Sequence, residues 1–253
     1  MNLAGIDGLL WLLLLLGPLF LLQRKLHYEL QGLLLILTRR ADISLILFSV
    51  LFLPGVVLHE GSHYLMARLL GVRTGRISLL PQAVRGGKLR LGYVETVSVD
   101  FVRDALIGAA PLLTGGLAVA YIGIGRLDLL PLGRDLLGGQ PGLFFQALAL
   151  LPAQTDFWLW FYLVFVTSSM MMPSAADRRA WLPVVLAAAA VSVLALVAGA
   201  GPWLAGTFAP ALNQGLRGMA VVVAISAAVH AVVLAPVWGG RLLLTRVTGM
   251  GLV

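Results

Sequence analysis

The residues whose types and spacing could do chemistry lie in one apolar stretch, at His59, Glu60 and His63. If this stretch is a helix, a spacing of four residues places both imidazoles on one face, one turn apart, where both can bind a single cation. Glu60 could then act as general base toward a water molecule at the metal. The chain holds four histidines and three glutamates, so chance placement gives this H-E-x-x-H pattern with a probability on the order of one in a thousand. We therefore predict a metal site, in preference to an ordinary polar contact between helices.

The chemistry of the ligands favours zinc, one ion per chain. Cysteine is absent, so imidazole and carboxylate groups must hold the metal. Bound zinc lowers the pKa of a water molecule to about 7 and polarises a carbonyl group. Catalytic zinc sites have three protein ligands and one open position. The pattern therefore leaves one protein ligand to be found elsewhere in the chain.

The preferred third ligand is Asp177, which follows an apolar run and the helix-stopping Pro173. The alternative role for Asp177 is an interfacial ion pair with one of the two arginines that follow it. Asp104, at the start of another apolar run, is the second candidate for the ligand. His230 stands alone on an apolar stretch, which is more typical of a core histidine with satisfied hydrogen bonds than of a ligand.

The composition places these residues in a membrane protein. The 253 residues are 60% hydrophobic with a mean hydropathy of +0.96, and only 11% are charged. The net charge of +7 makes no basic patch interleaved with aromatic residues, so we expect the lipid bilayer, and not nucleic acid, as the partner. The first apolar run follows Asp7 without a basic region or a cleavage site, which favours an uncleaved first helix.

The hydropathy pattern predicts an all-α polytopic membrane protein with about six transmembrane helices, in a single domain over residues 1–253. A short apolar stretch, Leu33 to Thr38, predicts an additional interfacial or re-entrant helix. The six expected spans are Leu3 to Leu22, Ile43 to Leu70, Ala105 to Ile124, Phe157 to Met172, Leu182 to Ala200 and Met219 to Val237.

A β-hairpin is predicted directly after the H-E-x-x-H helix. The segment from Arg73 to Asp100 is rich in charge and contains two β-prone runs, Ile77 to Leu80 and Leu89 to Val97, on either side of a glycine pair. The second run could offer an exposed edge to an extended substrate, or the hairpin could merely cover the site. The edge residues proposed for substrate binding are Leu89, Leu91, Tyr93 and Glu95.

Loop charges predict the orientation. Arginines and lysines crowd the hairpin, and Arg178, Arg179, Arg241 and Arg246 follow later helices, so these three segments should share the cytoplasmic side with the active site. We expect the plasma membrane as the location. The basic residues between Arg24 and Arg40 then fall on the opposite side, which this topology does not explain.

The chain resembles the site-2 protease family of intramembrane metalloproteases. The resemblance covers residues 54–181 and includes the H-E-x-x-H motif, Ala67 and Gly71 at successive intervals of four, the hairpin, and an Asp after a later helix. It implies that His59, His63 and Asp177 bind zinc and that Glu60 activates water. It also implies cleavage of peptide bonds in or near the transmembrane helices of membrane-protein substrates.

The second motif departs from that family. Its members usually carry Asn and Pro before Asp-Gly, whereas here Ser168, Ser169 and Pro173 precede Asp177, and Arg178 follows it. Ser169 could stand in for the missing amide. This departure keeps open a non-proteolytic membrane zinc protein that binds or escorts other membrane proteins. An ion transporter is a further alternative, disfavoured because one helix alone carries a ligand pair and the sequence has no repeat.

Overall fold

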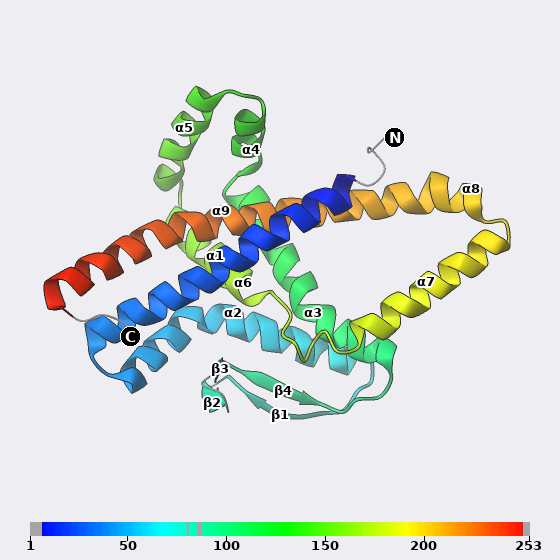
Figure 1. The fold of residues 1–253 in the computed structure, drawn as a ribbon, viewed down its shortest axis with the longest axis horizontal. Coiled ribbons are helices and arrows are strands. Elements are labelled where there is room, and N and C mark those ends of the chain that lie inside the picture. The colour runs from blue at the N-terminus through cyan, green and yellow to red at the C-terminus, as the bar shows by residue number, and fades with distance from the viewer. Residues whose placement is uncertain (1–6, 80, 85–87, 250–253) are drawn as a thin grey trace.

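The computed structural model describes residues 7–79, 81–84 and 88–249, and it is mostly helical (Figure 1). Its long helices are α1 (Asp7–Thr38), α2 (Ala41–Leu69), α3 (Phe101–Ala120) and α9 (Ala209–Thr248). The shorter ones are α4 (Leu130–Leu137), α5 (Pro141–Leu150), α6 (Phe157–Met170), α7 (Trp181–Val197) and α8 (Gly201–Trp203). Two π-helical turns, Tyr121–Arg126 and Leu204–Phe208, extend α3 and lead into α9, and a 3-10 turn, Leu151–Ala153, follows α5.

By length and composition, four helices could cross a membrane: Asp7–Thr38, Ala41–Leu69, Phe101–Arg126 and Gly201–Thr248. A fifth span results if α5 with its 3-10 turn and α6, which meet at 104°, form one broken span. The described chain is therefore compatible with a multi-pass integral membrane protein. The predicted six spans are not confirmed, because α6 has 14 residues and α7 has 17, and each is short for the hydrocarbon core.

Helix α1 is continuous, where the sequence predicted a transmembrane helix and a separate interfacial helix at Leu33 to Thr38. The charged residues that suggested a break lie inside the 32-residue helix. Glu29 is fully buried and bonds both to Lys25, one turn earlier (3.1 Å), and to Arg241 on α9. Because α9 supplies a counter-charge, α1 carries this carboxylate without interruption.

Helices α1 and α9 run parallel to each other and lie side by side (Figure 1). Asp7 pairs with Arg217 (2.6 Å) near one end, and Glu29 pairs with Arg241 toward the other. The C-terminal part of α9 therefore lies by the α1–α2 turn, at the opposite end of α2 from the start of the hairpin. The prediction that the basic segment around Arg241 and Arg246 shares a side with the hairpin is not confirmed. This segment instead lies near the basic residues between Arg24 and Arg40, which the predicted topology left unexplained.

The predicted hairpin is present as two antiparallel strand pairs that follow α2. Strand β1 (Thr74–Ser78) pairs with β4 (Tyr93–Thr96), and β2 (Gln82–Val84) pairs with β3 (Lys88–Arg90). The predicted run Leu89 to Val97 is thus divided between two strands. Leu80 and the glycine pair lie outside the described residues. Within those residues β4 pairs with β1 alone, which leaves its other edge without a strand.

Local sequence signals define the ends of the helices that flank the hairpin. Helix α2 ends before Gly71, whose φ of +70° is the left-handed conformation that glycine adopts without strain. Helix α3 begins after Asp100, whose carboxylate accepts hydrogen bonds from the backbone N–H groups of Val102 (3.1 Å) and Arg103 (2.9 Å). These two ends connect the hairpin to the H-E-x-x-H helix on one side and to α3 on the other.

Candidate metal centre

The three residues of the H-E-x-x-H pattern lie in the last third of α2, as predicted. Their side chains are largely shielded: His59 is 15% exposed, His63 is 9% exposed, and Glu60 is buried. The Ser62 hydroxyl turns back to the carbonyl of His59 (2.7 Å), so it does not compete for the site. The helix therefore presents two imidazoles from one face, with the carboxylate beside them.

Asp177 lies in the turn between α6 and α7, after Pro173. Its orientation comes from Ser174, three residues earlier: the Ser174 N–H donates to the Asp177 carboxylate (2.6 Å), and the Asp177 N–H donates to the Ser174 hydroxyl (3.3 Å). This reciprocal arrangement resembles a capping box. The predicted alternative was an ion pair between Asp177 and a neighbouring arginine. The structure shows no such pair among the residues it describes, and the Asp177 carboxylate instead faces the imidazoles of His59 and His63.

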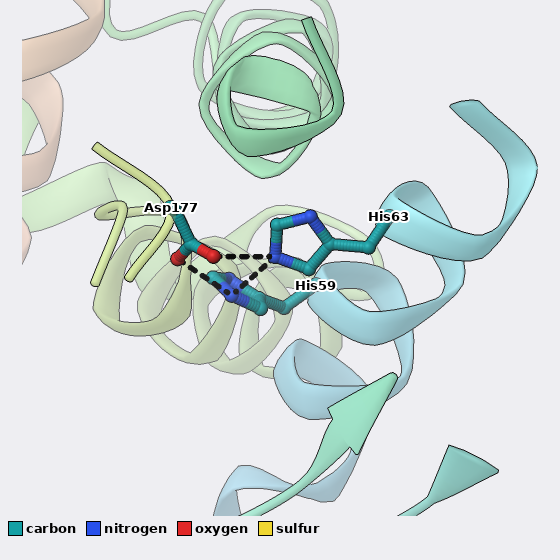
Figure 2. Close-up of side chains that lie close together, drawn as sticks. All are labelled: His59, His63 and Asp177. Carbon is teal, nitrogen blue, oxygen red and sulfur yellow. Dashed lines mark hydrogen bonds and ion pairs between the residues drawn. The ribbon is translucent and has the colours of Figure 1, made fainter. Parts of the chain in front are cut away.

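Both imidazoles and the carboxylate point toward one another (Figure 2). The Nε2 atoms of His59 and His63 are 3.3 Å apart. The Asp177 carboxylate lies 3.4 Å from Nε2 of His63 and 3.9 Å from Nε2 of His59. The three ligand atoms lie within 4.8 Å of one another, and the group could hold a metal ion. Among the described residues, no other set of three His, Asp or Glu side chains has this arrangement.

The second nitrogen of each imidazole bonds to a backbone carbonyl. Nδ1 of His59 donates to the carbonyl of Met170 (2.6 Å), and Nδ1 of His63 donates to the carbonyl of Ile107 (2.8 Å). Because a carbonyl only accepts, each Nδ1 carries the proton and each neutral ring keeps its lone pair on Nε2. Metal-binding histidines are typically oriented in this way. Three electron-pair donors thus converge, and this arrangement could hold a metal ion.

Glycines allow the backbone near Asp177 to approach α2 and α3. A Cβ atom at Gly108 on α3 would stand 2.0 Å from the Asp177 carbonyl oxygen, and one at Gly115 would stand 2.4 Å from Cβ of Met171. On α2, a Cβ at Gly55 would stand 2.3 Å from the carbonyl oxygen of Val166 on α6. Real Cβ atoms do not come this close, so the position of Asp177 depends on these glycines.

A cavity of about 720 Å³ opens beside the three ligands, and Glu60 forms part of its wall. Its other walls come from the hairpin, the start of α3 and the turn that carries Asp177. From the hairpin it is lined by alternate positions, Gly92, Val94, Thr96 and Ser98. This spacing of two residues shows that one face of β4 and its continuation is turned to the cavity.

Gly92 brings the hairpin close to the H-E-x-x-H helix. A Cβ atom there would stand 2.9 Å from both Cγ of Glu60 and Cγ1 of Val56, and 3.1 Å from the carbonyl oxygen of Ser78. Only a residue without a side chain allows the hairpin to pass over Glu60 at this distance. The hairpin therefore does cover the site, whichever of its two predicted roles it has.

The other predicted residues lie apart from the three ligand atoms. Asp104 lines the cavity, but its carboxylate accepts from the hydroxyl of Ser98 and the N–H of Val99 (3.4 Å), and it is not in the ligand group. His230 is fully buried and bonds to Ser169 (3.0 Å), as expected of a core histidine. Ser169 therefore faces α9 with its hydroxyl.

The hairpin residues that line the cavity are not the four that were predicted to bind substrate; they are the residues at even-numbered positions from Gly92 to Ser98. Tyr93 and Glu95 do not line it, and the Glu95 carboxylate accepts from the N–H of Arg76 (3.1 Å) on β1. The side chain of Leu89 lies outside the described residues, and Leu91 packs against the hydrophobic core. Their proposed role in substrate binding stays a prediction. It now rests on the backbone edge of β4 that lacks a partner strand among the described residues, and not on these side chains.

Sequence reasoning missed the groups that orient the ligands. The carbonyls of Met170 and Ile107 leave no signal in side-chain patterns. Ser174 could have been found, because serine three residues before an acidic residue is a capping pattern. Gly108 and Gly92 had no readable signal, since a glycine shows its role only when its neighbours in space are known.

Comparisons with protein-family models, with curated proteins and with solved structures find no match to this chain.

Proposed function

We propose that the protein is an intramembrane zinc metalloprotease that hydrolyses peptide bonds in or near the transmembrane helices of other membrane proteins. One observation carries the proposal: two imidazole Nε2 atoms and a carboxylate converge beside an open cavity that also contains Glu60. Zinc fits this donor set, because it accepts histidine nitrogen and carboxylate oxygen and leaves one position for water or substrate. The resemblance to site-2 proteases at the same residues supports the same reading.

In this proposal His59, His63 and Asp177 hold the metal, with their orientation set by the Met170 and Ile107 carbonyls and by Ser174. Bound zinc would lower the pKa of a water molecule and polarise the scissile carbonyl. Glu60 takes the proton of the attacking water and delivers it to the leaving nitrogen as the C–N bond breaks. Proton transfer by such a residue contributes about 10²- to 10⁴-fold to the rate.

A transmembrane helix buries its carbonyls in its own hydrogen bonds, so substrate must unwind before water can attack. In the part of the chain that the structure describes, one edge of β4 has no partner strand and could pair with the extended peptide. The face lined by Val94 and Thr96 borders the cavity. We therefore assign the approach of substrate to β4. The polar groups around the cavity keep it suited to water as well as to a peptide.

We further propose that the site opens toward the cytoplasmic side of the plasma membrane, because the turn with Arg178 and Arg179 and the basic hairpin border it. The absence of cysteine makes this testable with single cysteines in an otherwise unreactive chain. Ser98→Cys at the cavity and Arg40→Cys at the α1–α2 turn should react with an impermeant maleimide from opposite sides of intact cells. Reaction of Ser98→Cys from outside contradicts the proposed orientation.

The function is tested by measuring zinc content and proteolysis on the same preparations. Wild type should hold about one zinc per chain and cleave a single-span test substrate. His59→Ala and Asp177→Ala should lose the metal, because the roughly 10–16 kcal/mol that structural sites gain from binding is shared among few ligands. Glu60→Gln should keep zinc and lose cleavage by about 10²-fold or more.

Other results of these two measurements would contradict the proposal or support a different function. Full cleavage by Glu60→Gln contradicts a protease that works through Glu60. Zinc binding by wild type without cleavage of any single-span substrate supports the non-proteolytic zinc protein. A wild type that binds no zinc removes the metal centre and the case for this enzyme. If Asp177→Ala alone keeps full zinc, the third ligand must be sought elsewhere, beginning with Asp104 at the same cavity.

A further inference from the structure

A second set of buried polar groups meets at the C-terminal end of α6. Gln23 on α1 donates to the carbonyl of Ser169, and the Ser169 hydroxyl lies 3.0 Å from Nε2 of His230 on α9. His230 is 0% exposed and Ser169 is 2% exposed. Polar groups within transmembrane helices are costly and mostly functional, and the proposed reaction leaves these three without a role.

The direction of these hydrogen bonds follows from the groups that can only accept. Nδ1 of His230 lies 2.7 Å from the carbonyl oxygen of Ser226 on the same helix, so Nδ1 carries the proton. Nε2 of a neutral His230 is then an acceptor, and Ser169 donates its hydroxyl proton to it. The hydroxyl of Ser169 is thereby held toward α9, and its carbonyl is held toward α1.

The end of α6 is also the element that orients a proposed metal ligand. The last carbonyls of a helix have no donor within it. In α6 the carbonyl of Ser169 receives the Gln23 amide, and the next carbonyl, of Met170, receives Nδ1 of His59. Ser169 and Met170 therefore connect α6 to three helices. The Ser169 carbonyl contacts α1, the Met170 carbonyl contacts α2, and the Ser169 hydroxyl contacts α9. A shift of Ser169 would move the Met170 carbonyl and rotate the imidazole of His59.

We propose that His230 is a positioning residue for the metal centre, acting through Ser169 on the Met170 carbonyl that aims His59. The inference rests on the proposed function, since it assumes that His59 binds a metal. It differs from a core histidine that only contributes to folding, because it couples α9 to the affinity of a site on α2. Loss of groups that orient metal ligands lowers metal affinity by about 10- to 100-fold.

The test is the zinc dissociation constant, measured by competition with a chelating dye on purified protein. Ser169→Ala and His230→Phe should each weaken zinc binding by about 10- to 100-fold. The double variant should be little worse than either single one, because both remove the same hydrogen bond. His230→Gln, whose amide oxygen can accept from Ser169, should restore most of the affinity.

His27→Phe is the matched control. His27 lies on α1 among the rings of Phe48 and Phe52, and its Nε2 is buried without a hydrogen-bond partner, so the same substitution there breaks no bond to α6. It should leave zinc affinity unchanged. Thermal stability is recorded for every variant, since a merely structural histidine would change the melting temperature and not the zinc affinity.

Wild type that binds zinc, with equal affinity in Ser169→Ala, His230→Phe and His27→Phe, overturns the positioning role and leaves the proposed function standing. Additive losses in the double variant overturn the path through Ser169. Wild type that binds no zinc overturns the proposed function itself, and the positioning role with it. If His230→Phe does not fold, Ser169→Ala and His230→Gln still decide between the two roles.

Discussion

Two clusters of ionisable side chains are buried between the helices, and they differ in how their charges are balanced. Between α1 and α9, Glu29 accepts from Arg241 and Lys25, so a carboxylate meets two cations. Between α2 and the turn after α6, two Nε2 lone pairs and a carboxylate face one another. The first cluster is complementary within the chain, whereas the second is a set of electron-pair donors that could hold a metal ion.

The difference separates a structural polar cluster from one that could hold a metal ion, which we propose as a ligand-binding cluster. Burial alone does not distinguish them, because Glu29 in the first cluster and His63 in the second are both buried in helices long enough to cross a membrane. The distinguishing feature is the second nitrogen of each imidazole at the site. Nδ1 of His59 and Nδ1 of His63 are occupied by carbonyls, which directs the lone pairs inward. The Glu29 cluster contains no such unpaired acceptor.

The largest effect is expected where the complementary cluster is broken. Glu29→Ala leaves Arg241, only 16% exposed, without its carboxylate. Removing one partner of a buried ion pair is strongly destabilising, here by about 3 kcal/mol because Lys25 is half exposed. We expect a markedly lower melting temperature in detergent, with one zinc per chain retained by the folded fraction.

The control for Glu29→Ala is Asp42→Ala, which removes a close but exposed ion pair with Arg40 (2.6 Å). Exposed pairs contribute little, so the melting temperature should hardly change. If Glu29→Ala lost zinc as readily as Asp177→Ala, the two clusters would be coupled, and the division between a structural and a ligand-binding cluster would fail.

An intermediate effect is expected at Gly108, the residue on α3 that lies against the backbone of Asp177. A Cβ atom there would stand 2.0 Å from the Asp177 carbonyl oxygen, so Gly108→Ala must displace the turn. Zinc affinity should fall by about 10- to 100-fold, as when other groups that orient ligands are lost. A competition titration with a chelating dye measures it.

Gly116→Ala is the matched control on the same helix, because its Cβ would meet only Cγ1 of Val222, at 3.9 Å. Both substitutions raise the helix propensity of α3 equally, by roughly 1 kcal/mol. Equal zinc affinity in the two variants would show that the approach of α3 to Asp177 does not position the carboxylate.

Much of the ligand-binding cluster was predictable from the sequence, because its residues are marked by local patterns. The H-E-x-x-H spacing placed His59 and His63 on one face of α2, and Pro173 indicated the helix end before Asp177. The hairpin was predictable from a local change in composition. All of these signals lie within a few residues of the element they define, where propensity and periodicity apply.

The complementary cluster and the span count were not predictable, because they depend on partners far apart in the chain. The basic pair Arg24 and Lys25 indicated a break in the first helix, whereas in the structure the helix continues and its buried Glu29 is paired with Arg241, 212 residues later. The parallel course of α1 and α9 likewise decides which basic segments lie together. In the site itself, the Met170 and Ile107 carbonyls are backbone groups, which every residue type carries alike.

The smallest effect is expected at Gly92, where the hairpin passes over Glu60. A Cβ atom there would stand 2.9 Å from Cγ of Glu60 and 3.1 Å from the Ser78 carbonyl oxygen, so Gly92→Ala should lift the hairpin without touching a ligand. We expect one zinc per chain and cleavage reduced by about 10-fold, since misplacement near a general base costs part of its 10²- to 10⁴-fold contribution.

Gly61→Ala, next to Glu60 but with no atom within 4 Å of its added Cβ, should cleave as wild type does. If Gly92→Ala also cleaves at the wild-type rate, the contact with the hairpin has no part in the reaction, and the ligand-binding cluster is complete with α2, α3 and the Asp177 turn alone.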